Sequence, residues 1–96
     1  MNNDINKKLD ELNIELDEAS IPAGSYVPYV ITGNLVFISG QLPFINGEIT
    51  TTGKVGDNVS VEEGIKMAEA CAKAILSQLK AACNGDLNKV KKVVKL

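Results

Sequence analysis

The sequence predicts a small α+β fold in which a short β-hairpin packs against one long helix. Two observations support this prediction: apolar residues repeat at spacings of three and four over 61–83, and β-prone runs flank a Gly-Asn turn within 26–42. The 96 residues suffice for one domain, so 1–96 is treated as a single unit. Hydrophobic residues make up 45% of the chain and charged residues 23%, as is ordinary for a globular protein.

A short helix is expected near the amino end, over residues 4–12. Asp4 can cap its first turn, and Ile5, Leu9 and Leu12 recur on one face. A helix of this length is marginally stable alone. We therefore expect its apolar face to pack on the rest of the domain.

The segment 26–42 is expected to form a β-hairpin. Gly33-Asn34 is a two-residue turn signal, because glycine readily adopts the positive φ that such turns need. The returning run, 35–38, is apolar at every position, which is typical of a strand covered on both faces. A second signal, Asn46-Gly47, predicts a short outer hairpin.

The strongest local signal is a long helix over 61–83. Ser60 and Glu63 have the spacing of a capping box, in which each side chain accepts a hydrogen bond from the other residue's backbone. Cys71 and Cys83 lie on this helix about 18 Å apart, too far for a disulfide. An apolar stripe along the helix is expected to pack on the sheet. Its members are Val61, Ile65, Ala68, Ala72, Ile75, Leu79 and Ala82.

The last segment, 90–96, is predicted to be a strand with Val90, Val94 and Leu96 on one face. It ends on this apolar run without a turn or a polar tail. Free strand edges invite mispairing. We therefore expect either that the domain is incomplete at its carboxyl end or that another chain covers this edge.

Charge and composition exclude several kinds of chemistry. The net charge is −2, with ten lysines, no arginine and no histidine. A dedicated nucleic-acid binder would carry a basic face, and without histidine there is no imidazole base or imidazole metal ligand. The first residues do not have the pattern of a secretory signal, and no apolar run in the sequence is long enough to span a bilayer. A cytoplasmic location is the expectation.

Three segments resemble the RidA family, also known as YjgF. Residues 24–30 (Gly-Ser-Tyr-Val-Pro-Tyr-Val) are similar to the Gly-Pro-Tyr-Val segment that opens the family's first strand. Residues 33–43 are similar to its signature, a Gly-Asn hairpin turn, an apolar strand and then Ser-Gly-Gln-x-Pro. The alanine-rich helix, followed by Gly-Asp-Leu and the segment 90–96, is the third. The resemblance covers nearly the whole chain and is closest to a bacterial branch of the family.

This resemblance implies a chorismate-mutase-like fold and a homotrimer with ligand pockets between subunits. It also implies a hydrolase, an imine deaminase that converts reactive enamines and imines of the 2-aminoacrylate type to 2-keto acids and ammonia. That reaction needs neither a metal nor an organic cofactor. The expected ligand is a small imine or keto acid. Relatives have also been called endoribonuclease L-PSP or translation initiation inhibitor, so an RNA-directed role is an alternative, one that the acidic balance disfavours.

Carried over by position, the resemblance assigns Tyr26, Ser39 and Gly40 to the ligand pocket. The Tyr26 ring can wall the pocket, while the Ser39 hydroxyl and the Gly40 amide can bind a small carboxylate or its water. From the residues alone, Tyr26 could equally be a core aromatic, Ser39 a strand end and Gly40 the relief of a bulge.

The resemblance places the family's arginine on a later strand and its water-handling acid near the carboxyl end of the domain. Both positions lie beyond Leu96, and the chain has no arginine that could replace the first. We therefore expect that this chain alone is not a competent deaminase, and its catalytic residues stay unassigned. A non-catalytic module that binds keto acids is the alternative.

Overall fold

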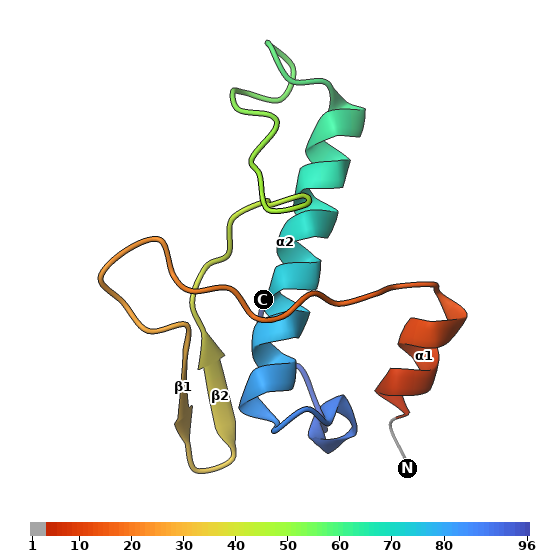
Figure 1. The fold of residues 1–96 in the computed structure, drawn as a ribbon, viewed down its shortest axis with the longest axis vertical. Helices are drawn as coiled ribbons and strands as arrows, with labels where there is room; N and C mark the ends of the chain where they lie inside the picture. Colours follow the sequence, from red (N-terminus) through yellow and green to blue (C-terminus); the bar gives the residue numbers. More distant parts are fainter. Residues whose placement is uncertain (1–3) are drawn as a thin grey trace.

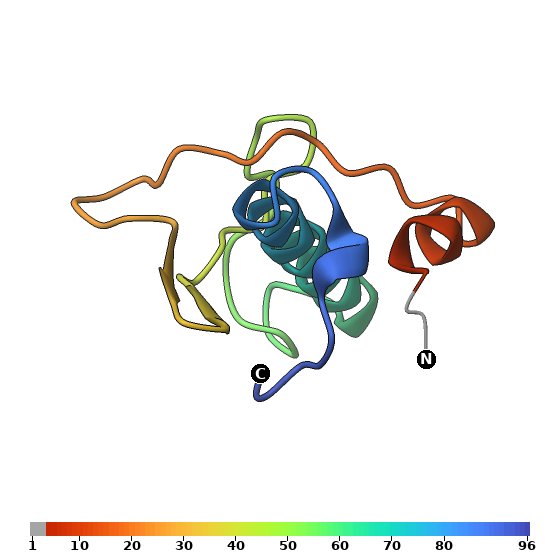
Figure 2. The same cartoon turned by 90° about the horizontal axis from the view of Figure 1, so that it is seen from below.

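The computed structural model describes residues 4–96, in which a β-hairpin lies along one side of a long helix (Figure 1). A view turned by 90° shows the short amino-terminal helix on the other side of that helix (Figure 2). The predicted α+β class is confirmed. In chain order the elements are α1 (Ile5–Glu11), β1 (Tyr29–Thr32), β2 (Leu35–Ile38), α2 (Val61–Ala82) and the 3-10 helix η1 (Leu87–Lys89).

Helix α2 begins at the predicted capping box. The Ser60 hydroxyl accepts a hydrogen bond from the Glu63 backbone N–H, and the Glu63 carboxylate accepts one from the Ser60 N–H, both at 3.1 Å. Two amides that the helix itself cannot satisfy are thereby bonded. At the other end, Asn84 and Gly85 have positive φ, and the Gly85 N–H donates to the Lys80 carbonyl at 2.8 Å. This geometry ends the helix.

Strands β1 and β2 pair antiparallel, with Val30 opposite Phe37 and Thr32 opposite Leu35. Gly33 has a φ of 55° in the turn between them, a conformation that glycine adopts at little cost. Both strands lie inside the range expected for the hairpin.

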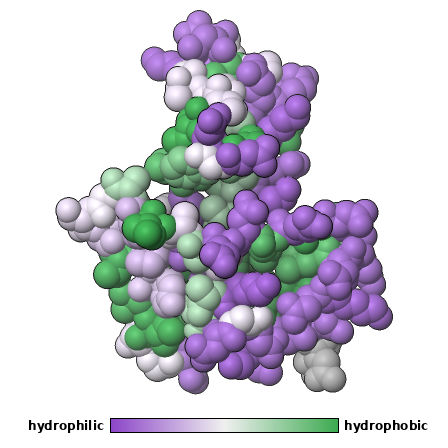
Figure 3. Space-filling view, viewed as in Figure 1, coloured by the Kyte–Doolittle hydropathy of each residue, from purple (hydrophilic) through white to green (hydrophobic). Residues whose placement is uncertain are grey.

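The two faces of this hairpin differ in exposure. The hairpin contacts α2, and the side chains of Val36 and Ile38 are half-buried. Successive side chains point to opposite faces, and on the other face Val30 is 51% and Phe37 is 58% exposed. The space-filling view shows apolar surface over the hairpin (Figure 3). The prediction that 35–38 is covered on both faces is therefore wrong for this chain, because Leu35 and Phe37 on the outer face stay 46% and 58% exposed.

Helix α1 is held to the carboxyl-terminal part of the chain by the side chains of Asn88 and Asp86, the latter accepting from the Asn6 side chain at 3.5 Å. The Asp4 carboxylate caps it by accepting from the Lys7 N–H at 3.0 Å. The Asn88 side-chain oxygen accepts from the backbone N–H groups of Ile5 and Asn6 at 2.7 and 3.2 Å. Donors in the first turn of α1 are thus bonded to η1, more than 80 residues away in the sequence.

The connection from β2 to α2 carries the second predicted turn. Asn46 and Gly47 both have positive φ, and they join a single bridge between Ile45 and Glu48. The expected outer hairpin is thus reduced to one bridged pair. Its turn has the positive φ values at both central positions that Asn-Gly favours.

Further along, this connection packs directly on the first turns of α2. A Cβ atom added at Gly64 would lie 2.9 Å from Cγ2 of Val55. The glycine therefore provides room for the loop. Val59, at the end of the same loop, is one of the few buried apolar residues, with 5% exposure.

The apolar stripe predicted on the helix is covered only in its carboxyl-terminal half. Val61 and Ile65 are 59% and 54% exposed, and Ala68 and Ala72 are exposed as well. In the amino-terminal half of the helix, the residues that are covered lie on a face adjacent to the predicted stripe. It comprises Gly64, Met67, Cys71, Ala74 and, on the next turn, Gln78.

The strand expected over 90–96 is not formed, because these residues belong to no helix or strand in the structure. Val93, Val94 and Leu96 are 63%, 76% and 97% exposed. A β-prone sequence becomes a strand only where another strand pairs with it. Both cysteines are free, as the helix geometry predicted. No helix among the described residues combines the length and the apolar character needed to cross a membrane.

Candidate ligand pocket

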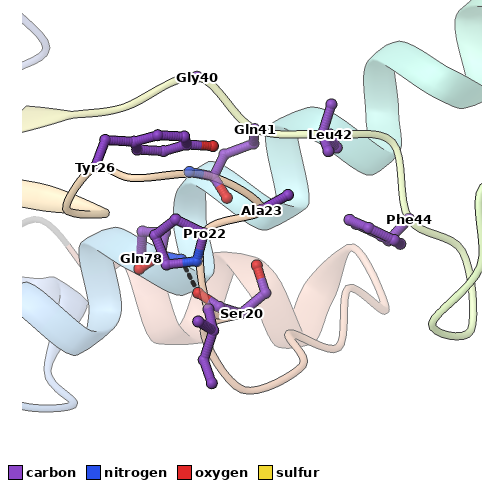
Figure 4. A pocket seen from close by; sticks show the side chains of 10 residues that line it. Ser20, Pro22, Ala23, Tyr26, Gly40, Gln41, Leu42, Phe44 and Gln78 are labelled. Carbon is purple, nitrogen blue, oxygen red and sulfur yellow. Dashed lines mark hydrogen bonds between the residues drawn. The ribbon is translucent and has the colours of Figure 1, made fainter.

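A small pocket lies where the loop before β1 and the chain leaving β2 meet Gln78 in the carboxyl-terminal part of α2 (Figure 4). The space inside it that water-sized spheres can occupy is about 20 Å³, enough for one or two water molecules. Its lining combines apolar side chains with two glutamines and a tyrosine. The lining residues are Ser20, Ile21, Pro22, Ala23, Tyr26, Gly40, Gln41, Leu42, Phe44 and Gln78.

Tyr26 forms part of the pocket wall, and its side chain is 49% exposed. It lies close to the loop backbone, because a Cβ atom added at Gly24 would be 3.0 Å from its Cε1 atom. The glycine thus leaves room for the ring. A half-exposed ring at the mouth of a pocket can stack on a ligand or on a residue of a neighbouring molecule.

Gly40 also lines the pocket, and a Cβ atom placed there would meet no atom within 4 Å. The space beside its backbone is therefore open to a ligand. Tyr26 and Gly40 belong to segments on either side of the hairpin. The antiparallel pairing of β1 with β2 brings these segments together.

Ser39 is placed differently from the other two predicted residues and is not among the residues that line the pocket. Its hydroxyl donates to the Val27 carbonyl oxygen at 2.7 Å, and its N–H donates to the Pro28 carbonyl at 2.9 Å. Both bonds extend the hairpin past the end of β2. In this chain Ser39 holds the two pocket-forming segments together, which is close to the strand-end role that the sequence left open.

Two glutamines that sequence reasoning did not select contribute polar groups to the lining. Gln41 donates from its side-chain Nε2 to the Ser39 backbone carbonyl at 2.9 Å, and the Gln41 backbone carbonyl accepts from the Cys71 thiol at 3.5 Å. Gln78 is only 2% exposed and donates from Nε2 to the Ser20 carbonyl at 2.8 Å. Its position could have been noticed, because a polar residue interrupts the helix between the apolar Ile75, Leu76 and Leu79.

The lining contains no charged side chain. An anionic ligand would therefore be held by neutral donors, which form weaker hydrogen bonds than charged ones. Among residues 4–96, no group of three or more Cys, Asp or Glu side chains is arranged to hold a metal ion. The lining has the mixed apolar and hydrogen-bonding character of a small-molecule site, but the space in it holds no more than one or two water molecules.

Comparison with known proteins identifies the family. Residues 6–96 match the family model described as "YjgF/chorismate mutase-like, putative endoribonuclease". The curated protein TCP17 of Trypanosoma cruzi is 46% identical over 88 residues, which are 92% of this chain and 54% of that protein. The chain thus spans about half the length of the curated relative that it matches.

Two solved structures are similar in fold. The protein Atu1372 of Agrobacterium tumefaciens, described as of unknown function, is 47% identical with a TM-score of 0.80, over 94% of this chain and 54% of that one. A "putative endoribonuclease" of Shewanella oneidensis MR-1 is 32% identical with a TM-score of 0.77, over 85% of this chain and 54% of that one. The resemblance seen in the sequence is confirmed, and the chain belongs to the YjgF/chorismate mutase-like family.

Proposed function

We propose that this chain forms one wall of a RidA-type site that acts on reactive enamines and imines of the 2-aminoacrylate type. The observation that carries the proposal is that Tyr26 and Gly40, which the family resemblance assigns to the ligand, line the same pocket. In the proposed reaction, water adds to the imine carbon and ammonia leaves, so that a 2-keto acid is formed. No redox partner is needed.

The chain contributes only part of what this reaction requires. The Tyr26 ring and the open backbone at Gly40 can position a small planar molecule, and Gln78 offers a buried amide nearby. The lining has no charged group to anchor a carboxylate and no acid or base to move a proton. We therefore expect the 96-residue chain to bind the ligand weakly and not to turn it over.

The outer face of the hairpin supports the further proposal that the protein works as a homotrimer. Val30, Leu35 and Phe37 are between 46% and 58% exposed and lie on one face of the sheet. A contiguous apolar face of this kind is typical of a subunit interface. We expect Phe37→Ser to lower the mass measured by light scattering to that of a monomer, whereas Thr32→Ser on the same face leaves it unchanged.

A thermal-shift assay with pyruvate and 2-ketobutyrate tests the binding step. We expect both to raise the melting temperature of the chain, and Tyr26→Ala to abolish the increase. Tyr29→Ala, which removes the other tyrosine, serves as the control for stability. If no keto acid changes the melting temperature, the proposed ligand class is wrong.

Turnover is measured as pyruvate release from freshly generated 2-aminoacrylate. The 96-residue chain is compared with a chimera that joins it to the part of Atu1372 outside the matched span, in the order found in that relative. We expect no acceleration by the chain alone and a rate above that of buffer for the chimera. A chimera that binds keto acids without accelerating release would contradict the deaminase assignment.

That last outcome would favour the second candidate, a non-catalytic module that binds keto acids. The structural observation behind it is the Ser39 hydroxyl, which is bonded to the Val27 carbonyl and lies outside the pocket lining. A site whose polar groups are occupied within the protein binds ligands mainly by shape. Such a module would report keto acid levels through a change of stability or assembly.

An RNA-directed activity, suggested by the words used for the family and for the Shewanella relative, is the least supported candidate. The net charge of −2 and the absence of arginine and histidine leave neither a basic face nor an imidazole base. RNA binding that persists above about 0.2 M salt would require this view to be revised.

A further inference from the structure

Two asparagines in the sequence, Asn46 and Asn84, are each followed by a glycine. Such a pair is chemically labile, because the backbone nitrogen of the glycine can attack the side-chain amide of the asparagine and glycine has no Cβ atom to obstruct the approach. Every other asparagine precedes a residue that has a side chain. Spontaneous deamidation is therefore expected to be fastest at these two positions.

The two pairs share the same local backbone conformation. Asn46 and Asn84 have φ values of 51° and 55°, and the glycines that follow them, Gly47 and Gly85, have φ values of 80° and 90°. All four residues are exposed. Neither the local conformation nor the access of water therefore distinguishes one pair from the other.

The pairs differ in the hydrogen bonding of the nitrogen that would attack. The Gly85 N–H donates to the Lys80 carbonyl at 2.8 Å, as part of the structure that ends α2. The Gly47 N–H donates to no acceptor in the described part of the chain. Gly85 must therefore break a hydrogen bond before it can react, whereas Gly47 has no such bond to break.

The surroundings of the two pairs differ in the same direction. The turn that holds Asn46 is closed by a single bridge, in which Ile45 and Glu48 exchange backbone hydrogen bonds of 2.8 and 3.1 Å. At the other pair, the N–H groups of Asn84 and Asp86 also donate to carbonyls at the end of α2, at 3.2 Å each. The backbone rotation that brings an asparagine side chain to the next nitrogen is thus opposed by more bonds at Asn84.

We propose that Asn46 is a site of spontaneous covalent modification, and that the end of α2 protects Asn84 from the same reaction. The Gly47 nitrogen loses its proton and bonds to Cγ of Asn46, and the side-chain nitrogen leaves as ammonia. Water then opens the resulting succinimide ring at one of its two carbonyl groups, which gives aspartate or isoaspartate. The reaction consumes only water and does not depend on the ligand or on the proposed deaminase activity.

The two products differ in their effect on the turn. Aspartate adds a negative charge but keeps the turn, because Asp-Gly favours the same turn type as Asn-Gly. Isoaspartate passes the chain through its former side chain, so that the backbone gains a methylene group and Ile45 loses its register with Glu48. The preceding residue, Phe44, lines the pocket. Formation of isoaspartate would therefore loosen one wall of the pocket.

The 96-residue chain is incubated in mildly alkaline buffer and, in parallel, in the same buffer with urea. Cleavage after lysine places Asn46 in the peptide 9–54 and Asn84 in the peptide 81–89, and mass spectrometry with fragmentation follows deamidation at each. In urea we expect comparable rates. In the folded protein we expect the ratio of the Asn46 rate to the Asn84 rate to be at least about fivefold higher than in urea, the factor that corresponds to a hydrogen bond of about 1 kcal/mol.

Asn46→Gly and Asn84→Gly are the matched variants, because glycine accepts the positive φ at both positions and carries no amide. We expect Asn46→Gly to abolish labelling of the aged protein by an isoaspartyl methyltransferase, and Asn84→Gly to leave it unchanged. The proposal is overturned if the ratio of the two rates is the same in the folded protein as in urea. It is also overturned if Asn84 reacts faster than Asn46 in the folded protein, or if neither reacts there while both react in urea.

Hydrogen exchange tests the effect on the turn. The isoaspartate form is separated from the aged protein and compared with freshly purified Asn46→Asp, which has the added charge without the extra methylene group. We expect faster exchange of the Ile45 and Glu48 amides in the isoaspartate form alone. Equal exchange in the two forms would contradict the proposed loss of register.

Discussion

The Ser39 hydroxyl donates a 2.7 Å hydrogen bond to the backbone carbonyl of Val27, across the open end of the hairpin. This bond holds the segment that carries Tyr26 against the segment that carries Gly40, and both residues line the pocket. The serine therefore shapes the site from outside its lining.

Ser39→Ala removes this bond, and we expect it to lower the free energy of unfolding by about 1 kcal/mol, the usual net contribution of a hydrogen bond. Urea denaturation measures the change. Ser25→Ala, at an exposed serine nearby, is the control and should change stability by less than about 0.5 kcal/mol. If Ser39→Ala abolishes keto acid binding without changing stability, the hydroxyl contacts the ligand directly.

Gly24→Ala should displace the Tyr26 ring without unfolding the protein. The new Cβ atom would lie 3.0 Å from Cε1 and 3.3 Å from Cδ1 of that ring, and the half-exposed ring is free to rotate away. Because the chain contains two tyrosines and no tryptophan, Tyr29→Phe leaves Tyr26 as the single fluorophore. In that background we expect Gly24→Ala to alter the tyrosine emission and to reduce the rise in melting temperature that keto acids cause. The stability without ligand should stay unchanged. Unchanged emission would mean that the ring does not depend on Gly24.

Replacing the buried Gln78 by methionine should cost about 1–2 kcal/mol, because the Ser20 carbonyl loses its donor at the floor of the pocket. The loop that carries Pro22 and Ala23 should become more mobile, which hydrogen exchange over residues 20–24 would detect. Glu69→Met, at an exposed site on the same helix, is the matched control. A stability loss without increased exchange in the loop would mean that Gln78 acts only through packing.

The contact between Gly64 and Val55 can be measured as a double-mutant cycle. Alanine is favoured over glycine in a helix by about 1 kcal/mol, but here its Cβ atom would lie 2.9 Å from Val55 Cγ2. We expect Gly64→Ala to raise the free energy of unfolding little in the parent, and by close to the full amount of about 1 kcal/mol in the Val55→Ala background. The coupling energy should be at least about 0.5 kcal/mol. Strict additivity would mean that the loop does not pack on the helix in solution.

The capping box gives α2 a defined dependence on pH. The pKa of the Glu63 carboxyl is lowered from 4.5, mainly by the hydrogen bond from the Ser60 backbone N–H and then by the Ser60 side chain, with a smaller contribution from Lys66. A folded-state pKa below the unfolded value stabilises the fold above about pH 4.5, and this contribution is lost as the pH falls through the folded value.

Glu63→Gln tests this dependence, because glutamine preserves the capping geometry without titrating. Thermal unfolding between pH 3 and pH 7 should show a shallower decline on the acid side for the variant than for the parent. Ser60→Ala removes the cap and should cost about 1 kcal/mol at neutral pH. Identical acid profiles for Glu63→Gln and the parent would show that the carboxylate does not contribute.

The parts of the fold that could be predicted from the sequence are those set by local rules. The capping box, the Gly33 turn and the limits of α2 follow from neighbours within a few residues, and the structure reproduces them. Burial of an apolar face depends instead on what packs against it. The outer face of 35–38, the first half of the helix stripe and the side chains of 93–96 are exposed in the structure. An apolar pattern shows which face a residue prefers to bury, but it does not show which polypeptide provides the cover.

The candidate site follows the same division. The family resemblance assigns Tyr26 and Gly40 to one pocket, and the pairing of the hairpin brings the segments that carry them together. The Ser39 hydroxyl joins those segments by bonding to the Val27 carbonyl. The position of that carbonyl depends on the loop before β1, which residue spacing in the sequence does not predict. Gln78 was missed because it reaches the pocket from a helix whose rotation against the loop is a tertiary property.

The hydrogen bonds from the Ile5 and Asn6 backbone N–H groups to the Asn88 side chain couple the position of α1 to that of η1. Residues 90–96 follow η1 directly, so a change in their path would act on the same anchor. The position of α1 would then report that change. A probe on Lys8, an exposed residue of α1 that does not line the pocket, would detect it.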